Sequence, residues 1–151
     1  MATVSDILFR KGRSIRTIEP TASVYQAIEQ MLKHNVGALL VLSIGRPHGI
    51  ITERDYLRRV ALEGRRSQTT AVYEIMSSPL VTVAPDTTVD ECMSIMTDRK
   101  IRHLPVLEDD ELVGLVSIGD VVKYKVQDQK SEIRSLIDYV QGGAAAVYCA
   151  R

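Results

Sequence analysis

The sequence of 151 residues has no tryptophan, one phenylalanine, two cysteines and no long apolar run. Cys92 and Cys149 lack the spacing of a metal site or a redox pair, which favours a reducing compartment. No stretch approaches the ~18 apolar residues that cross a bilayer, and the start of the chain lacks a signal-peptide core. We therefore expect a cytoplasmic protein or, if a transit segment has been removed, a protein of the mitochondrial or plastid matrix.

An excess of charge of one sign is also missing, as are the patterns of catalytic sites. Nineteen basic residues balance nineteen acidic ones, so the overall charge does not favour nucleic acid or an anionic membrane as partner. No set of nucleophile, base and oxyanion donor is visible, and neither is a metal-ligand set or a P-loop. Of the histidines His34, His48 and His103, the first two have ordinary explanations in a helix end and a turn. We expect a protein that is not an enzyme.

What the sequence does contain is a long internal repeat. Residues 17–55 reappear as residues 82–120 without a gap, so that Pro20 aligns with Pro85 and Asp55 with Asp120. Such a repeat indicates one supersecondary unit used twice, with each copy burying its apolar face against the other. We divide the chain into copy one (1–66), copy two (70–126) and a C-terminal helix and tail (127–151).

Each copy predicts a strand, a helix, two strands and a second helix. The first helix begins with a capping box, Ser23 with Gln26 in copy one and Thr88 with Glu91 in copy two. Apolar residues then follow at helical spacing and predict the buried face. They are Val24, Ala27, Ile28, Met31 and Leu32 in copy one, and Val89, Cys92, Met93 and Met96 in copy two. Packing is therefore the favoured role of Cys92.

Two short apolar segments in each copy predict a buried hairpin. They are residues 38–42 with 49–51 and residues 104–107 with 114–116. The second helix begins at Thr52 or Ser117. In copy one we expect it to bury Tyr56, Leu57, Val60 and Ala61 and to end at Gly64. In copy two it either continues or restarts as an amphipathic helix that ends at Gly142–Gly143.

The motif Gly-apolar-apolar-hydroxyl-x-x-Asp occurs at residues 49–55 and again at 114–120. A hydroxyl N-cap and an acid in the first turn are common at helix starts for structural reasons alone. The same turn also presents free backbone amides that can hold a phosphate. A neighbouring carboxylate can accept hydrogen bonds from the vicinal hydroxyls of a ribose. The motif therefore suits a ribose phosphate.

With the repeat, this motif and Ile-Arg-His-Leu-Pro-Val at 101–106, residues 1–126 resemble a tandem pair of CBS domains, a Bateman module. The family is named for cystathionine β-synthase. The motifs of this chain are similar to those of small stand-alone members from bacteria and plant organelles. The resemblance implies an α/β (α+β) fold of two β-α-β-β-α units with pseudo-twofold symmetry. It also implies a homodimer and an adenosine ligand in each of two clefts between the copies.

The resemblance assigns residues to both clefts. Site one would comprise Thr17, Ala22, Val36, Gly37, His103, Ser117, Gly119 and Asp120. Site two would comprise Thr82, Thr87, Ile101, Arg102, Thr52, Arg54 and Asp55. The aspartates would hold the ribose, and Arg54, Arg102 and His103 would be the phosphate partners.

The two copies differ at these positions. Arg102–His103 aligns with Gly37–Ala38, and Arg54 aligns with Gly119. We hypothesise that site one is a competent nucleotide site, and that site two is weaker or selective for another ligand. The arginines between residues 54 and 66 either form a solvated face or partly serve the phosphate.

The sequence therefore predicts a sensor without catalytic activity. AMP is the first expected ligand, with ADP, ATP, S-adenosylmethionine and NAD as alternatives, and ligand would shift the population between two packings of the copies or chains. An unknown protein would be the regulated partner. A ligand-free homodimeric scaffold is the alternative, and so is a regulator of a redox partner such as thioredoxin, as the resemblance to plant members implies.

Overall fold

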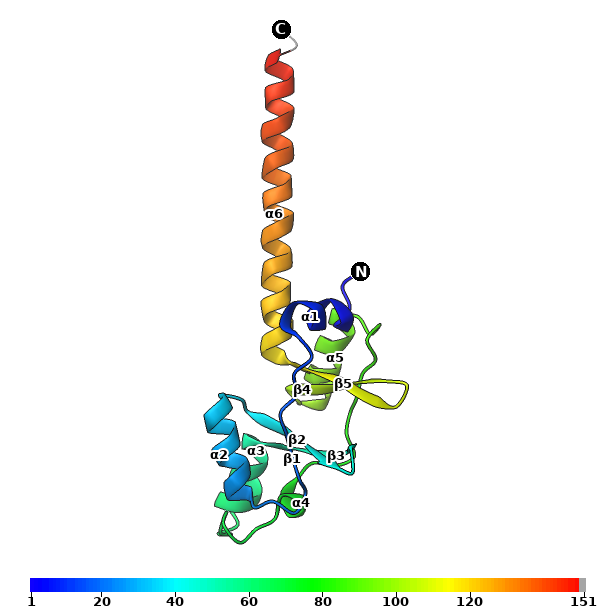
Figure 1. Cartoon of the computed structure of the whole chain (residues 1–151). Coiled ribbons are helices and arrows are strands. Elements are labelled where there is room, and N and C mark those ends of the chain that lie inside the picture. The colour runs from blue at the N-terminus through cyan, green and yellow to red at the C-terminus, as the bar shows by residue number, and fades with distance from the viewer. Residues whose placement is uncertain (150–151) are drawn as a thin grey trace.

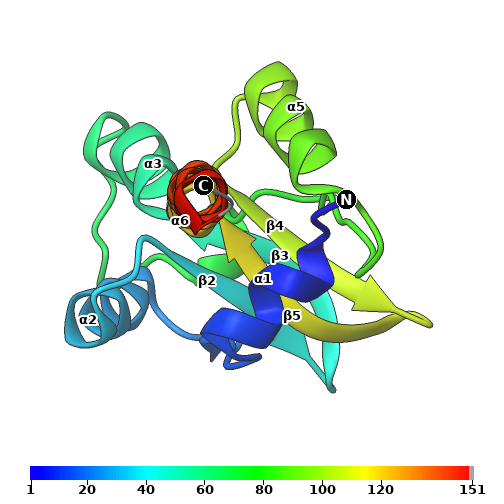
Figure 2. The same ribbon diagram turned by 90° about the horizontal axis from the view of Figure 1, so that it is seen from above.

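A computed structural model describes residues 1–149, and it describes side chains as far as residue 142. The helices are α1 (Val4–Lys11), α2 (Val24–His34), α3 (Glu53–Tyr56), the π-helix η1 (Leu57–Ala61), α4 (Val72–Ile75), α5 (Val89–Arg99) and α6 (Ile118–Cys149). The strands are β1 (Thr17–Ile18), β2 (Ala38–Ser43), β3 (Arg46–Thr52), β4 (His103–Glu108) and β5 (Glu111–Ser117). One sheet has the order β1-β2-β3 and the other pairs β4 with β5. Figure 2 looks down α6 and shows one hairpin lying across the other, with β3 in contact with β5.

The repeat is confirmed as a repeated structure. Helices α2 and α5, strands β2 and β4, and strands β3 and β5 have the same bounds once the copies are aligned. Both hairpins shift register at the same place, after Val41 and after Val106. Both predicted capping boxes are formed. Local sequence therefore determines the same hairpin and preceding helix twice, and the predicted α+β class is correct.

The first strand is the exception. In copy one, β1 pairs in parallel with β2. In copy two only Val83 forms a bridge, to Val106, so the regular strand predicted there is wrong. Two backbone hydrogen bonds still hold Val83 against β4, because its N–H donates to Pro105 O and its carbonyl accepts from Leu107 N.

Two helices precede the repeated segments, and each packs on the other copy. Helix α1 buries Val4, Ile7 and Leu8 in the core of copy two. Helix α4 buries Val72 and Ile75 in the core of copy one. Helix α1 contacts β5 and α6, and Figure 1 shows α4 at the opposite end of the molecule with copy one. Each core therefore needs residues from both halves of the chain, which ties the copies together.

These helices explain the glycine of the repeated motif. A Cβ added at Gly114 would lie 2.7 Å from Cδ2 of Leu8 in α1, and one at Gly49 would lie 2.8 Å from Sδ of Met76, next to α4. Real Cβ atoms do not approach other atoms so closely, so the leading helix packs on the strand only where a glycine stands. The glycine is needed for packing, whatever the motif binds.

The predicted buried faces are only partly right. Cys92 and Val60 are buried as expected, but Leu32 is 78% exposed and Met93 is also exposed. Leu57 and Ala61 were expected inside and lie outside. The π-helix η1 begins at Leu57, and its wider turn rotates the following side chains about the helix axis relative to an α-helix.

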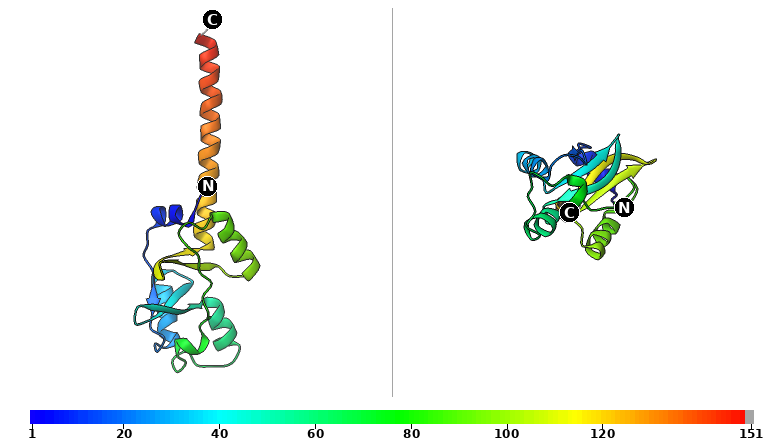
Figure 3. Two further views of the ribbon diagram at one scale, coloured as in Figure 1. Left: turned by 90° about the vertical axis from the view of Figure 1, so that its right-hand side faces the viewer. Right: turned by 90° about the horizontal axis from the view of Figure 1, so that it is seen from below.

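Copy two ends in a helix that is much longer than its counterpart. Helix α6 runs through Gly142–Gly143 to Cys149, so the predicted end at these glycines is wrong. A glycine costs a helix only about 1 kcal/mol relative to alanine, and the alanines that follow favour continuation. Figures 1 and 3 show α6 rising from copy two well beyond the two sheets. The described side chains end at residue 142, so the last part of the predicted helix and tail (127–151) lies outside them.

Within residues 1–149, no helix has both the length and the apolar character needed to cross a membrane.

Candidate functional site

Asp120 lies in the first turn of α6, where the motif places it. Its Oδ2 atom accepts a hydrogen bond from Ser117 N at 2.9 Å, and its own N–H donates to Ser117 Oγ at 3.2 Å. Lys11, the last residue of α1, brings its Nζ to 2.6 Å from the same Oδ2 and also donates to Leu115 O at 2.8 Å. The side chains of Lys11 and Asp120 remain 32% and 22% exposed, so solvent reaches this pair.

The surroundings keep the Asp120 carboxyl ionised. Partial burial alone would raise its pKa. The hydrogen bond and the charge of Lys11, together with the hydrogen bonds of Ser117, outweigh this effect. They hold the pKa of Asp120 below its ordinary value. An acceptor that is charged at neutral pH is therefore present at the start of α6.

His103 is the meeting point of charges from several elements. It begins β4, opposite Ser117 of β5, and is half-buried. Burial lowers its pKa, while the charges of Asp120 and Glu53 oppose this effect and those of Lys11 and Arg102 add to it. The imidazole is thus neutral at pH 7 and stands among charges from α1, copy one and copy two.

Copy one contributes Gly37 and Glu53 to this region. Glu53 N donates to Gly37 O at 3.1 Å, and a Cβ at Gly37 would lie 3.6 Å from the Glu53 carboxyl carbon. The same bond recurs in copy two, where Ile118 N donates to Arg102 O at 2.8 Å. Gly37 and Arg102 therefore occupy equivalent places. The Glu53 carboxylate lies next to Gly37, whereas the side chain of Arg102 is itself a cation.

Part of the predicted site one comes together in this region. Asp120, Ser117 and His103 are neighbours, Gly119 lies in the same first turn of α6, and Gly37 lies under Glu53. The other three residues belong to the copy-one layer: Thr17 is exposed on β1, whereas Ala22 and Val36 pack against the copy-one core. Their predicted contacts with an adenine ring stay predictions.

Asp55, the aspartate of site two, has both carboxylate oxygens engaged inside the protein. Oδ2 accepts from Thr52 N at 3.0 Å and from Thr52 Oγ1 at 3.1 Å, and Oδ1 accepts from Ser77 Oγ at 2.9 Å. The residue is 8% exposed. Ser77 is itself held by two backbone hydrogen bonds to Ile50. A ribose could reach Asp55 only if these bonds were broken.

The remaining residues of site two divide into two groups. Arg54 extends from copy one to copy two, where Nη1 lies 3.5 Å from Lys100 O, next to Ile101 and Arg102. Thr82 and Thr87 line an open surface hollow of about 490 Å³ in copy two. Asp55 is not part of the lining of that hollow. The structure thus joins Arg54 to the Ile101–Arg102 turn and leaves the two threonines elsewhere.

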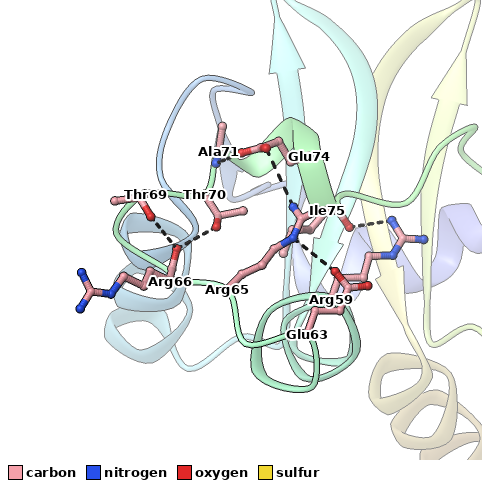
Figure 4. Close-up of polar contacts among 9 residues, drawn as sticks. All are labelled: Arg59, Glu63, Arg65, Arg66, Thr69, Thr70, Ala71, Glu74 and Ile75. Carbon is pink, nitrogen blue, oxygen red and sulfur yellow. Dashed lines mark hydrogen bonds and ion pairs between the residues drawn. The ribbon is translucent and has the colours of Figure 1, made fainter.

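Two other arginines of the basic stretch, Arg59 and Arg65, have structural partners (Figure 4). Arg59 donates to Ile75 O and Met76 O, at 3.0 and 3.1 Å, and so caps the end of α4. Arg65 pairs with Glu63 at 3.2 Å. These arginines fix the linker between the copies and the helix that follows it, which favours the structural interpretation over a phosphate site.

Three residues that shape the two sites are not among the predicted site residues: Lys11, Glu53 and Ser77. A signal for α1 existed, because Thr3 and Asp6 have the spacing of a capping box and Thr3 N donates to Asp6 Oδ2. No local signal marks Lys11, whose partner Asp120 is 109 positions away. Among the described residues, His, Cys, Asp and Glu side chains form no group of three that could hold a metal ion.

The comparisons with known proteins agree with this architecture. The family model "CBS domain" matches residues 4–62 and 72–127. The CBS domain-containing protein CBSX3, mitochondrial, of Arabidopsis thaliana is 45% identical over 152 residues, which cover 93% of this chain and 73% of the relative. The CBS domain-containing protein YhcV of Bacillus subtilis is 31% identical, and the match covers 87% of this chain and 91% of that protein.

A solved structure shows the same fold. A protein with CBS domains from Burkholderia ambifaria MC40-6 superposes with a TM-score of 0.83 at 46% identity, covering 85% of this chain and 96% of that one. The match and the two copies seen in the structure lead to one assignment. The chain belongs to the CBS-domain family and carries two CBS domains in tandem.

Proposed function

We propose that the protein is a regulatory module that binds an adenine nucleotide in site one and reports the nucleotide level to another protein. AMP is the first ligand to test, and ADP, ATP, S-adenosylmethionine and NAD are the alternatives. Proteins that consist only of CBS domains are typically regulatory modules without catalytic activity, which supports a role in sensing. The regulated partner is a second protein of unknown identity.

The observation that carries the proposal is the setting of Asp120. An ionised carboxylate that is partly open to solvent stands at the N-terminal end of a helix, next to the Ser117 amide. Its geometry suits the vicinal hydroxyls of a ribose. His103, Arg102 and Lys11 supply a neutral imidazole and two cations close by, which suit a phosphate.

The output would be a population shift. Asp120 belongs to the first turn of α6, and its partner Lys11 ends α1. Arg10 of the same helix lies over the Tyr124 ring of α6, with its guanidinium carbon 4.5 Å from the ring centroid. A ligand that binds Asp120 acts on a junction between these helices, so it favours the arrangement of α1 and α6 that accommodates it.

In a homodimer, a shift in the position of α6 would also act on the second chain. The described part of α6 carries exposed Val126, Ile133, Leu136 and Val140. Branched residues recur every seventh position, and the intervening contact positions hold Gln129 and Leu136; the branched residues with Leu136 resemble a parallel two-stranded coiled coil. We propose that a second copy covers this stripe. Sedimentation analysis of the double variant Ile133→Glu, Leu136→Glu should then show monomers where the parent chain forms dimers.

A ligand-free scaffold is the second candidate, and one observation favours it: side chains of the protein itself occupy both aspartates. With either role, sensor or scaffold, the regulated partner could be a redox protein such as thioredoxin. We propose the cytoplasm as the location of the protein. The name of the Arabidopsis relative supports the mitochondrial matrix as the alternative.

Thermal denaturation with added nucleotides separates the sensor from the scaffold. A ligand at ~100 times its dissociation constant stabilises the folded state by ~2.7 kcal/mol. We expect AMP to raise the melting temperature of the parent chain and to have no effect on Asp120→Ala. Mass spectrometry of small molecules released on denaturation would identify a ligand that copurifies. If no adenine nucleotide shifts the melting temperature and none is released, the scaffold is the correct function.

A further inference from the structure

Lys11 stands where a ribose would have to bind. Its ammonium group and the Ser117 amide both donate to Asp120 Oδ2, at 2.6 and 2.9 Å. Two strong donors use the capacity of that oxygen, because a carboxylate oxygen offers about two lone pairs. A ribose that places one of its two vicinal hydroxyls on each carboxylate oxygen must therefore displace one of these donors. The ligand and Lys11 therefore compete for Asp120.

Displacing Lys11 from Asp120 breaks a charge-assisted hydrogen bond. Only a ligand that carries an anion can form a new one with the ammonium group. The lysine is held by two acceptors, Asp120 and Leu115 O, and its stem is flexible and 32% exposed. A nucleoside would take Asp120 from the ammonium group and bring no anion in exchange. A nucleotide would offer its phosphate as the new partner, since ammonium groups bind phosphate as point charges.

The charges around His103 make this exchange necessary. With the imidazole neutral, the cations that act on it are Lys11 and Arg102, and the anions are Asp120 and Glu53. Without Lys11 two carboxylates would face one guanidinium, and the site would repel a phosphate. Gly37 stands where copy two has Arg102 and adds no cation, and Arg54 of copy one donates to Lys100 O.

We propose that Lys11 is the residue that makes site one select nucleotides over nucleosides. In the free protein it neutralises Asp120, and in the complex it moves from Asp120 to the ligand phosphate while ribose hydroxyls take its place. The inference rests on the proposed function of site one and adds a residue from outside the repeated motif. It also makes the end of α1 the part of the protein that responds to occupancy.

The test is calorimetric titration of AMP and of adenosine into the parent chain, Lys11→Met and Lys11→Arg. We expect Lys11→Met to bind adenosine more tightly and AMP more weakly, so that the ratio of the two affinities falls about tenfold, as for one charge-assisted hydrogen bond. Lys11→Arg should restore most of the ratio. Lys33→Met, a change of an exposed lysine in the last turn of α2, is the matched control and should leave the ratio unchanged.

The outcomes separate this inference from the proposed function. If the parent chain binds AMP and Lys11→Met keeps the same ratio, the role of Lys11 is wrong and the nucleotide site stands. If both affinities rise together in Lys11→Met, Lys11 is only a competitor and does not bind phosphate. If the folded parent chain and Lys11→Met bind neither ligand, both the site and the role of Lys11 are wrong. Circular dichroism of each variant is the control for folding.

Discussion

The two copies share their hairpins and motif but treat the motif aspartate in opposite ways. In copy one, Asp55 is buried, and the Ser77 hydroxyl donates to its second carboxylate oxygen. The backbone of Ser77 is itself hydrogen-bonded to β3. In copy two, Asp120 is partly open, and a flexible lysine pairs with it. Both closing residues lie at the end of a leading helix, since Lys11 is the last residue of α1 and Ser77 follows α4. The same motif therefore serves stability in one copy and remains available for binding in the other.

The largest effect should come from removing Asp55. Asp55→Ala leaves the Thr52 amide and hydroxyl and the Ser77 hydroxyl without their acceptor inside the protein. We expect a loss of about 3 kcal/mol in the free energy of unfolding, measured by urea denaturation. Asp120→Ala should cost only about 1 kcal/mol, because its carboxylate is partly solvated and its partner is exposed. Equal losses would mean that the two aspartates have the same structural role.

Opening site two is the next test. Ser77→Ala removes the only hydroxyl that donates to Asp55 Oδ1 among the described contacts, so that this oxygen is free, like Oδ1 of Asp120. We expect a loss of about 1 kcal/mol in stability. We also expect a second, weak AMP binding event in calorimetry, absent from the parent chain. If Ser77→Ala gains no binding, the closed carboxylate is not what disables site two.

The pH dependence of stability should differ once His103 is replaced by the copy-one residue, alanine. Burial lowers the pKa of His103, so the folded chain takes up this proton at lower pH than the unfolded chain. Its contribution to stability is present above the ordinary pKa of 6.5 and is lost as the pH falls from there through the folded pKa. Between pH 7 and pH 5, urea denaturation should show a smaller loss for His103→Ala than for the parent chain. A parallel decline would contradict the role of His103.

The smallest effect is expected at Cys92. Burial, with a smaller contribution from Glu91, raises the pKa of its thiol to about 11, so it is not a reactive thiolate at neutral pH. Its counterpart Ala27 is equally buried. Cys92→Ala should therefore cost no more than about 1 kcal/mol of stability and leave AMP binding unchanged. A loss of AMP binding in this variant would show that the packing prediction missed a role.

Sequence patterns predicted what depends on neighbours along the chain. The capping boxes, both hairpins and the helix start at each motif aspartate follow from residues within a few positions of one another. The buried position of Cys92 follows from helical spacing. The π-turn of η1 and the continuation of α6 through Gly142–Gly143 were missed because small local energies decide them.

The difference between the sites could not be predicted, because it is made by long-range contacts. Lys11 meets Asp120 across 109 positions, and Ser77 meets Asp55 across 22. Neither pair belongs to the repeat, since α1 and α4 pack on the opposite copies. Repeat alignment therefore located the two motif aspartates and the differing basic residues, but it could not show which carboxylate is closed.

Calorimetric titration of AMP into the parent chain, Asp120→Asn and Asp55→Asn tests the central claim most directly. Asparagine keeps the size of the side chain and removes its charge, so folding is disturbed less than by alanine. We predict one AMP per parent chain, no binding to Asp120→Asn, and one AMP with unchanged affinity for folded Asp55→Asn. Two equal sites per chain, or loss of binding in Asp55→Asn alone, would contradict the account.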